Sequence, residues 1–236
     1  MQQVDAWIAQ AGMTPAQVAS RAGMARSTVH RIAHEETDPK ISTLREIAIA
    51  CGYDLAVSLV PLSDPDAATA ARLLLEDGYA PASNRAVRQW VDRLQRVAGD
   101  DPLAIACEAA HASTLLHRAG ARYFTGTVHL PRLVSEADHV STRWALSGAP
   151  MLDGRGPAIV WTDNADALAR LAAEHLVPVQ DATQATVLIA PSHPDLYFDS
   201  FVEQSVRYVA PVQMILDSLG IPGPLAEDAL AEAKRW

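Results

Sequence analysis

Cysteine is scarce in this sequence, with two residues among 236, Cys51 and Cys107. This scarcity excludes a disulfide-rich scaffold, because such scaffolds need several paired cysteines. Each cysteine falls on the apolar face of a predicted helix. We therefore expect two buried, reduced thiols rather than a disulfide or a pair of metal ligands.

Long apolar runs are lacking as well. No stretch approaches the roughly 18 consecutive apolar residues that a membrane-spanning helix requires. Residues 1–5 have neither the basic stretch nor the apolar stretch of a secretory signal. We expect a cytoplasmic protein that does not enter the membrane.

The signatures of catalysis and of cofactor binding are missing too. The glycine-rich segment 148–156 lacks the Lys-Ser/Thr ending of a phosphate loop and the spacing of a dinucleotide-binding turn. We interpret it as a hairpin or an edge loop. The chain has no Gly-x-Ser-x-Gly nucleophile motif. These absences predict a protein that is not an enzyme and has no cofactor.

Titratable residues do not gather into a convincing metal or acid–base site. His30 and His34 have helical spacing but lack an accompanying Glu-x-x-His or cysteine partner, so we expect no metal there. Asp195 and Asp199 lie near His193. This group is more typical of a solvated loop or helix start than of a carboxylate site.

What the sequence does contain is a pair of short helices joined by a tight turn at residues 14–32. Thr14 can cap the first helix, and Pro15 suits its first position. Gly23 can adopt the left-handed conformation that ends this helix. Val29 and Ile32 place one face of the second helix inward. The outward residues of that helix are Arg26, Ser27, Thr28, His30 and Arg31.

This spacing predicts a helix-turn-helix, in which the second helix fits the DNA major groove. Arginine, serine and threonine can reach base edges or phosphates from that position. Further helices fit residues 4–11 and 44–51. The alternative interpretation is an ordinary small helical bundle, but the glycine turn, the two outward arginines and the Asp38-Pro39 break favour the DNA-binding one.

Residues 3–60 resemble the Cro/repressor (Xre) family of helix-turn-helix regulators. The resemblance is carried by Thr14-x-x-x-Val18-Ala19, Gly23, the 26–29 run and Asp38-Pro39. It implies that Arg26, Ser27, Thr28, His30 and Arg31 read bases or clamp phosphates, and that Gln17 contacts the DNA backbone. Residues 54–61 resemble a short strand that some members add.

One departure from the family concerns the start of the second helix. Ala25 stands where the family often has serine or threonine as a helix cap. A missing cap costs on the order of 1 kcal/mol. We therefore expect a less rigid recognition helix.

Positive charge is in deficit, with a net charge of −9. Residues 1–60 hold five basic and six acidic residues, a net of −1, and the remainder holds 14 basic and 22 acidic residues, a net of −8. Phosphate neutralisation supplies most of the non-specific DNA affinity. A single domain should therefore bind weakly, and we expect a homodimer on two half-sites about 10 to 10.5 base pairs apart.

The rest of the chain predicts a mixed fold. Pro61 and Pro65 mark a linker. Helices fit residues 67–76, 84–98, 103–117, 163–175, 206–219 and 225–234, and strands fit 122–130, 143–146, 158–161, 176–179 and 185–190. We expect an α+β protein with an all-α domain at 1–61, a helical linker region at 62–101, and an α/β domain at 102–236 with a small mixed sheet packed by helices.

The later region resembles the C-terminal part of AbiEi-type antitoxins, which repress bacterial toxin–antitoxin operons. The resemblance is carried by residues 106–110, the strands 158–161 and 187–189, and the tail 209–219 followed by Gly223. It implies an operator-binding autorepressor whose partner is a nucleotidyltransferase-like toxin. The N-terminal domain departs from that family, which usually has a winged helix there.

A second function remains open at this point. The chain could be a one-component regulator that senses a small ligand, in which case Tyr123, Trp144 and Trp161 would line a pocket. The alternative role for these aromatic residues is to fill the core of the sheet.

Overall fold

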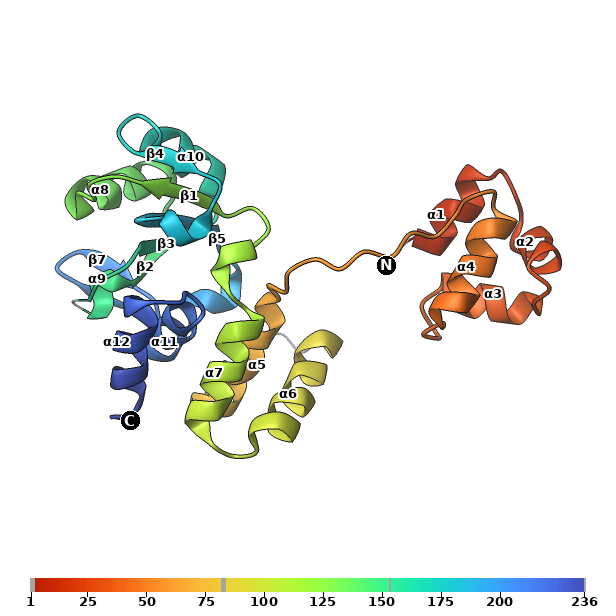
Figure 1. Cartoon of the computed structure of the whole chain (residues 1–236), viewed down its shortest axis with the longest axis horizontal. Helices are drawn as coiled ribbons and strands as arrows, with labels where there is room; N and C mark the ends of the chain where they lie inside the picture. The colour runs from red at the N-terminus through yellow and green to blue at the C-terminus, as the bar shows by residue number, and fades with distance from the viewer. Residues whose placement is uncertain (1–2, 82–83, 153, 236) are drawn as a thin grey trace. The chain divides into compact units, whose positions relative to one another are not determined.

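The computed structural model describes residues 3–81, 84–152 and 154–235. The chain divides into two compact units, Met1–Val60 and Pro61–Trp236 (Figure 1). The first unit is helical, and the second combines helices with a sheet, so the protein is α+β. Residues 54–64 contain neither helix nor strand.

The N-terminal unit packs short helices around a small apolar core. Its helices are α1 (Gln3–Gln10), α2 (Pro15–Arg21), α3 (Arg26–Ala33) and α4 (Ile41–Ala50). Val18, Val29 and Ile47 are fully buried at the centre. Cys51 lies in the same cluster, where burial raises the pKa of its thiol.

The second unit is built on a mixed sheet with strand order β4-β1-β5-β3-β2-β7-β6. The strands are β1 (Arg122–Thr125), β2 (Trp144–Gly148), β3 (Ala158–Thr162), β4 (Val177–Val179), β5 (Val187–Pro191), β6 (Phe201–Glu203) and β7 (Val206–Tyr208). The pairs β3–β5 and β2–β7 are parallel, and the other pairs are antiparallel.

Helices cover both faces of this sheet. The helices of this unit are α5 (Pro65–Leu75), α6 (Arg85–Ala98), α7 (Pro102–Ala112), α8 (Leu130–Val140), α9 (Ala149–Leu152), α10 (Ala165–Ala172), α11 (Pro211–Leu219) and α12 (Pro224–Ala233). Figure 1 shows α5, α7, α11 and α12 on one side of the sheet and α8 and α10 on the other. Along β3, Ile159 and Trp161 belong to the core on the first side, and Ala158 and Val160 to the core on the second. This is the alternation of a strand buried on both faces.

The helices of residues 62–101 belong to the second unit. The residues on α5 and α6 that pack inward, such as Ala70 and Leu94, share one apolar cluster with the sheet residue Ile159. Two further contacts hold this region: the Asp64 backbone nitrogen donates to the Ala112 carbonyl at 2.9 Å, and the Trp90 indole donates to the Asp64 carboxylate at 2.8 Å.

Several local expectations are wrong. Residues 54–61 are not a strand, since no described strand pairs with them. The helix expected at 206–219 begins at Pro211, because Val206–Tyr208 pairs with β6 instead. The strand expected at 122–130 ends at Thr125, and α8 and β6 had no predicted counterpart. Cys107 is exposed, because α7 turns its alanines inward.

The aromatic residues considered as pocket walls belong to the core. Trp144 and Trp161 are 4% and 2% exposed. Tyr123 is partly buried against the apolar cluster that contains Trp161, and its hydroxyl donates to the Leu115 carbonyl at 2.7 Å. These three side chains therefore do not line an open pocket.

A buried polar network fixes α11 against the sheet. The Asp217 carboxylate accepts hydrogen bonds from Ser147 Oγ at 2.7 Å, Trp161 Nε1 at 2.8 Å and Gln213 Nε2 at 2.8 Å. Burial raises the pKa of Asp217, and these three donors and the charge of Arg118 oppose the rise. Gln213 and Asp217 lie in the tail segment that resembles AbiEi-type antitoxins, so this segment contributes buried hydrogen bonds to the fold.

Candidate nucleic-acid interface

The first helix of the candidate interface, α2, is held by a capping box. Thr14 Oγ1 accepts from the Gln17 backbone nitrogen at 3.3 Å, and the Thr14 backbone nitrogen donates to Gln17 Oε1 at 2.8 Å. The amide oxygen of Gln17 is therefore engaged at the helix start. Gln17 is exposed, and its amide nitrogen remains available to donate to the DNA phosphate that the family resemblance assigns to it.

The turn between α2 and α3 uses a left-handed glycine. Gly23 has φ +64°, a backbone conformation that residues with a Cβ rarely adopt. The next backbone nitrogen, that of Met24, donates back to the Ala19 carbonyl at 2.9 Å. This closure fixes the angle at which α3 leaves the turn.

The third helix has one buried face and one polar face. Val29, Ile32 and Ala33 are buried against the other helices of the unit. All five residues that the sequence predicted to face outward are exposed: Arg26, Ser27, Thr28, His30 and Arg31. The structure therefore brings the five predicted contact residues of α3 together on one exposed face.

This arrangement of capped helix, glycine turn and polar second helix has a match among known families. Residues 6–57 match the family described as Helix-turn-helix. These residues form an Xre-type helix-turn-helix domain. The chain has no match among curated proteins or among solved structures. The match lies within the N-terminal unit and supports a DNA-binding transcriptional regulator.

Helix α3 of this helix-turn-helix domain begins without a side-chain cap. Ala25 occupies the cap position with an extended backbone, φ −66° and ψ 140°, and no side-chain hydrogen bond. The first backbone N–H groups of α3 therefore rely on solvent or a ligand. This is the structural counterpart of the departure from the family at Ala25.

His30 is held in place by a neighbour on the next turn. The rings of His30 and His34 stack with centroids 4.0 Å apart and an interplanar angle of 11°. His34 Nδ1 lies 3.0 Å from the His30 carbonyl oxygen. Across the residues that the structure describes, no group of three or more His, Cys, Asp or Glu side chains could hold a metal ion.

Arg21 lies close to the interface but has a structural role. Its guanidinium donates to Met13 Sδ at 3.3 Å and to the Ala50 carbonyl at 3.5 Å. These contacts join α2 to the end of α4.

Among the described helices, none is long and apolar enough to cross a membrane.

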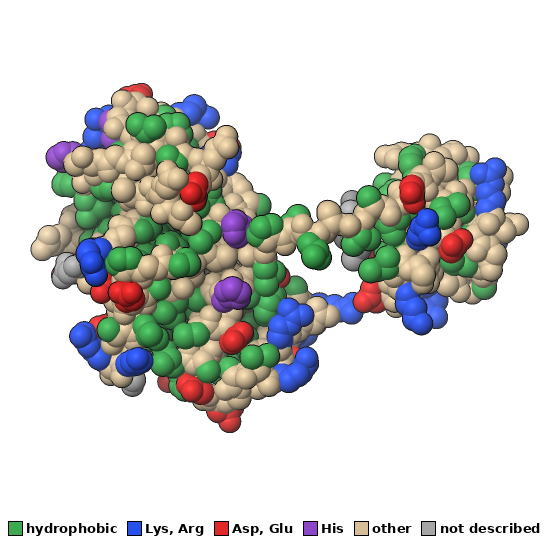
Figure 2. Space-filling model, in the orientation of Figure 1, with side chains coloured by type: hydrophobic (Ala, Val, Ile, Leu, Met, Phe, Trp, Pro, Cys, Tyr) green, Lys and Arg blue, Asp and Glu red, His purple; other side chains and the backbone are tan. Residues whose placement is uncertain are grey.

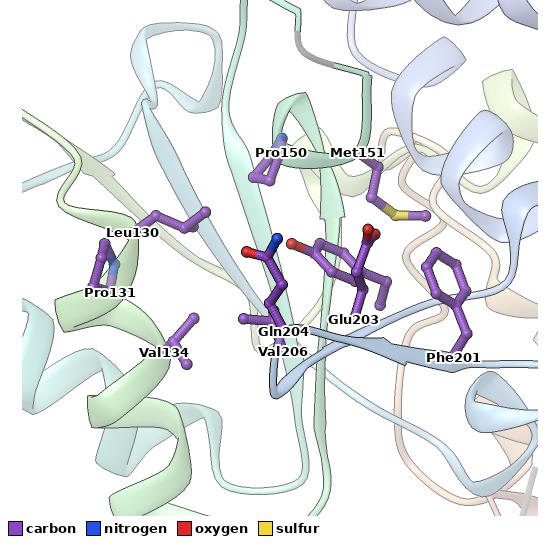
Figure 3. A pocket seen from close by; sticks show the side chains of 10 residues that line it. Leu130, Pro131, Val134, Pro150, Met151, Phe201, Glu203, Gln204 and Val206 are labelled. Carbon is purple, nitrogen blue, oxygen red and sulfur yellow. The ribbon is translucent and has the colours of Figure 1, made fainter.

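The second unit has a separate cavity of about 670 Å³. Its walls come from α8, α9 and the β6–β7 hairpin, and its lining combines apolar side chains with the polar groups of Glu203, Gln204 and Tyr208. Figure 3 shows the side chains of Glu203 and Gln204 extending toward Pro150 and Met151. Phe201 stacks on Tyr208, with ring centroids 5.5 Å apart.

Sequence reasoning did not predict this cavity. The hairpin turns at Gln204 and Ser205, which have φ +48° and +68°, and neither residue is the glycine or asparagine that favours such a turn.

The buried side chain of Arg72, which is 1% exposed, is another feature that the sequence did not predict. It donates to the carbonyls of Asp195, Leu196 and Phe198 at 3.2, 3.4 and 2.9 Å, so the 193–199 segment is held by a buried arginine.

Proposed function

We propose that this protein is a bacterial antitoxin that binds its own operator as a repressor and neutralises a nucleotidyltransferase-like toxin. The observation that carries the proposal is the pairing of a helix-turn-helix domain with a separate, larger and acidic unit. That unit has a net charge of −8, from 14 basic and 22 acidic residues after residue 60. Its resemblance to AbiEi-type antitoxins supplies the class of partner.

Charge complementarity supports direct neutralisation. A toxin that acts on RNA needs a basic groove, and an acidic domain can cover such a groove and accelerate capture. The DNA-binding unit is nearly neutral, with a net charge of −1. We therefore propose a cytoplasmic homodimer in which two copies share one operator, since a single copy neutralises few phosphates.

Co-expression with the product of the neighbouring gene tests the proposal. We expect the protein to rescue growth from a nucleotidyltransferase-like toxin. Fluorescence anisotropy with the upstream promoter fragment should show that saturating toxin changes the operator affinity. Failure to rescue growth, together with an affinity that toxin does not change, would contradict the proposal.

A second candidate function is supported by the cavity between α8 and the β6–β7 hairpin. Its volume of about 670 Å³ lies within the roughly 300–1,000 Å³ of small-molecule sites. Its apolar side chains, such as Leu130, Val134 and Met151, and the Glu203 carboxylate suit a small cationic molecule with an apolar part. A regulator of this kind would respond to such a molecule, and its operator affinity would be unaffected by the toxin.

A further inference from the structure

Helix α6 presents a strongly basic face. Trp90 and Leu94 are buried on the side that packs against α5 and α7. With 100° per residue, the polar residues of the helix fall on the opposite side. The exposed residues of that side are Arg85, Arg88, Gln89, Asp92, Arg93, Gln95 and Arg96.

This face reverses the charge of the unit that carries it. Residues 85–98 hold four arginines and one aspartate, a net of +3, whereas all residues after 60 sum to −8. Figure 2 shows Lys and Arg side chains gathered over α6 in the space-filling view. A local charge of this sign attracts anions even on an acidic protein.

Some arginines of the second unit are neutralised by a carboxylate, whereas, within the part of the chain that the structure describes, three arginines of α6, like Arg155 and Arg170 elsewhere on the unit, are not. Arg72, Arg122, Arg132 and Arg235 each form an ion pair with a carboxylate. Among the described residues, Arg85, Arg93 and Arg96 form none. The Arg93 guanidinium lies 4.4 Å from the centroid of the Trp90 ring, which holds its stem along the helix.

We propose that the arginine face of α6 binds the phosphate backbone of DNA outside the bases that α3 reads. The proposal rests on DNA binding by the helix-turn-helix domain. Guanidinium groups match phosphate oxygens in bidentate geometry and keep their charge at all working pH values. The helix-turn-helix domain has a net charge of −1, so α6 supplies the phosphate neutralisation that it lacks.

Chain length permits this contact. Residues 54–64 form no helix or strand, and eleven extended residues reach up to about 36–40 Å. One turn of DNA is about 34 Å long. The basic face can therefore engage backbone that flanks the half-site bound by α3 of the same chain.

The salt dependence of binding by the full chain tests the proposal. The double variant Arg85→Gln/Arg96→Gln keeps good helix formers at exposed positions. The slope of log K against log salt changes by about 0.9 for each phosphate contact. We expect a slope shallower by about 1.8 in anisotropy titrations, with affinity reduced equally on the operator and on a random duplex. Unchanged slope in the folded variant would overturn the proposal.

Two further variants make the result specific. Arg155→Gln/Arg170→Gln removes the same charge from exposed positions elsewhere on the unit and should leave the slope unchanged. An equal effect in this pair would overturn a local contact. An α6 variant that binds DNA normally but no longer captures the toxin would assign the face to a protein partner and overturn the proposal.

The same titrations separate this proposal from the proposed function. Arg31→Ala should remove the preference for the operator over a random duplex while keeping the α6 contribution to the slope. A wild-type protein without operator preference would contradict the proposed repressor. The slope comparison on the random duplex would still decide the role of α6.

Discussion

At the scale of single residues, Asp217 makes the stability of the second unit depend on pH. Burial raises its pKa above the ordinary value of about 3.9. A carboxyl whose folded-state pKa is raised stabilises the fold at low pH, and this contribution is lost as pH rises through the folded pKa. Compared with Asp217→Asn, the wild-type protein should therefore lose stability as pH increases above about 4. Urea denaturation from pH 4 to 7.5 measures this difference.

Asp181 provides a control because its pKa is shifted in the opposite direction to that of Asp217. Hydrogen bonds from Thr183 and Gln184 lower the pKa of its exposed carboxyl. The contribution of Asp181 is therefore present at neutral pH and lost as pH falls. Asp181→Asn should not reproduce the trend of the Asp217 variant. Parallel pH profiles for the wild type and Asp217→Asn would show that the buried carboxyl does not titrate as expected.

The residue scale also shows where sequence reasoning stops. The tail containing Gln213 and Asp217 carries a family resemblance, but no pattern in the sequence identifies the other hydrogen-bond partners of Asp217. Ser147 and Trp161 lie 70 and 56 positions away from Asp217. Such pairs form only when the sheet and α11 come together, because no local periodicity encodes them.

At the scale of elements, the uncapped start of α3 predicts that a capping residue at position 25 would stabilise the N-terminal unit. Ala25 already has the extended backbone of a cap residue, with ψ 140°. Ala25→Ser adds an acceptor for the first N–H groups of α3 and should stabilise the N-terminal unit by about 1 kcal/mol. Thermal denaturation followed by circular dichroism measures the effect. Ala25→Val lacks the hydroxyl acceptor, and a similar gain in that variant would contradict a capping origin.

Elements with local signals were predicted, and elements defined by distant partners were not. Thr14, Pro15 and Gly23 lie within ten residues, and they encode the α2–turn–α3 segment by capping and backbone conformation. The apolar spacing of Val206–Tyr208 continues into α11 and predicts a helix. This segment is a strand because β6 and Leu146 of β2 pair with it.

At the scale of the whole molecule, the fold class follows from sequence and the sheet order does not. The buried run 187–190 indicates a central strand. Its neighbours β1 and β3 lie more than twenty residues away in the chain. The α3 face was predicted because its residues share one short helix. The cavity at the β6–β7 hairpin was not, since its walls come from three separate segments.

The charge of the whole chain leads to a last prediction, on the operator. A helix-turn-helix domain of net charge −1 gains little from phosphate neutralisation, so we expect two domains to act on one duplex even when α6 adds phosphate contacts. Joining two sites through a dimer raises affinity without new contacts. A duplex with one scrambled half-site should bind at least about tenfold more weakly than the intact operator, as gel-shift titration would show.

Spacing provides the geometric control for this prediction. Half-sites about 10 base pairs apart lie on one face of the duplex. Inserting about five base pairs turns the second half-site to the opposite face, and the gain from the second domain should fall. Inserting a full turn of about ten should restore more of it, because the two sites share a face again. Equal affinity for the intact operator and the single half-site would mean that one domain binds alone, and the deficit of positive charge would then have to be met by α6 of the same chain.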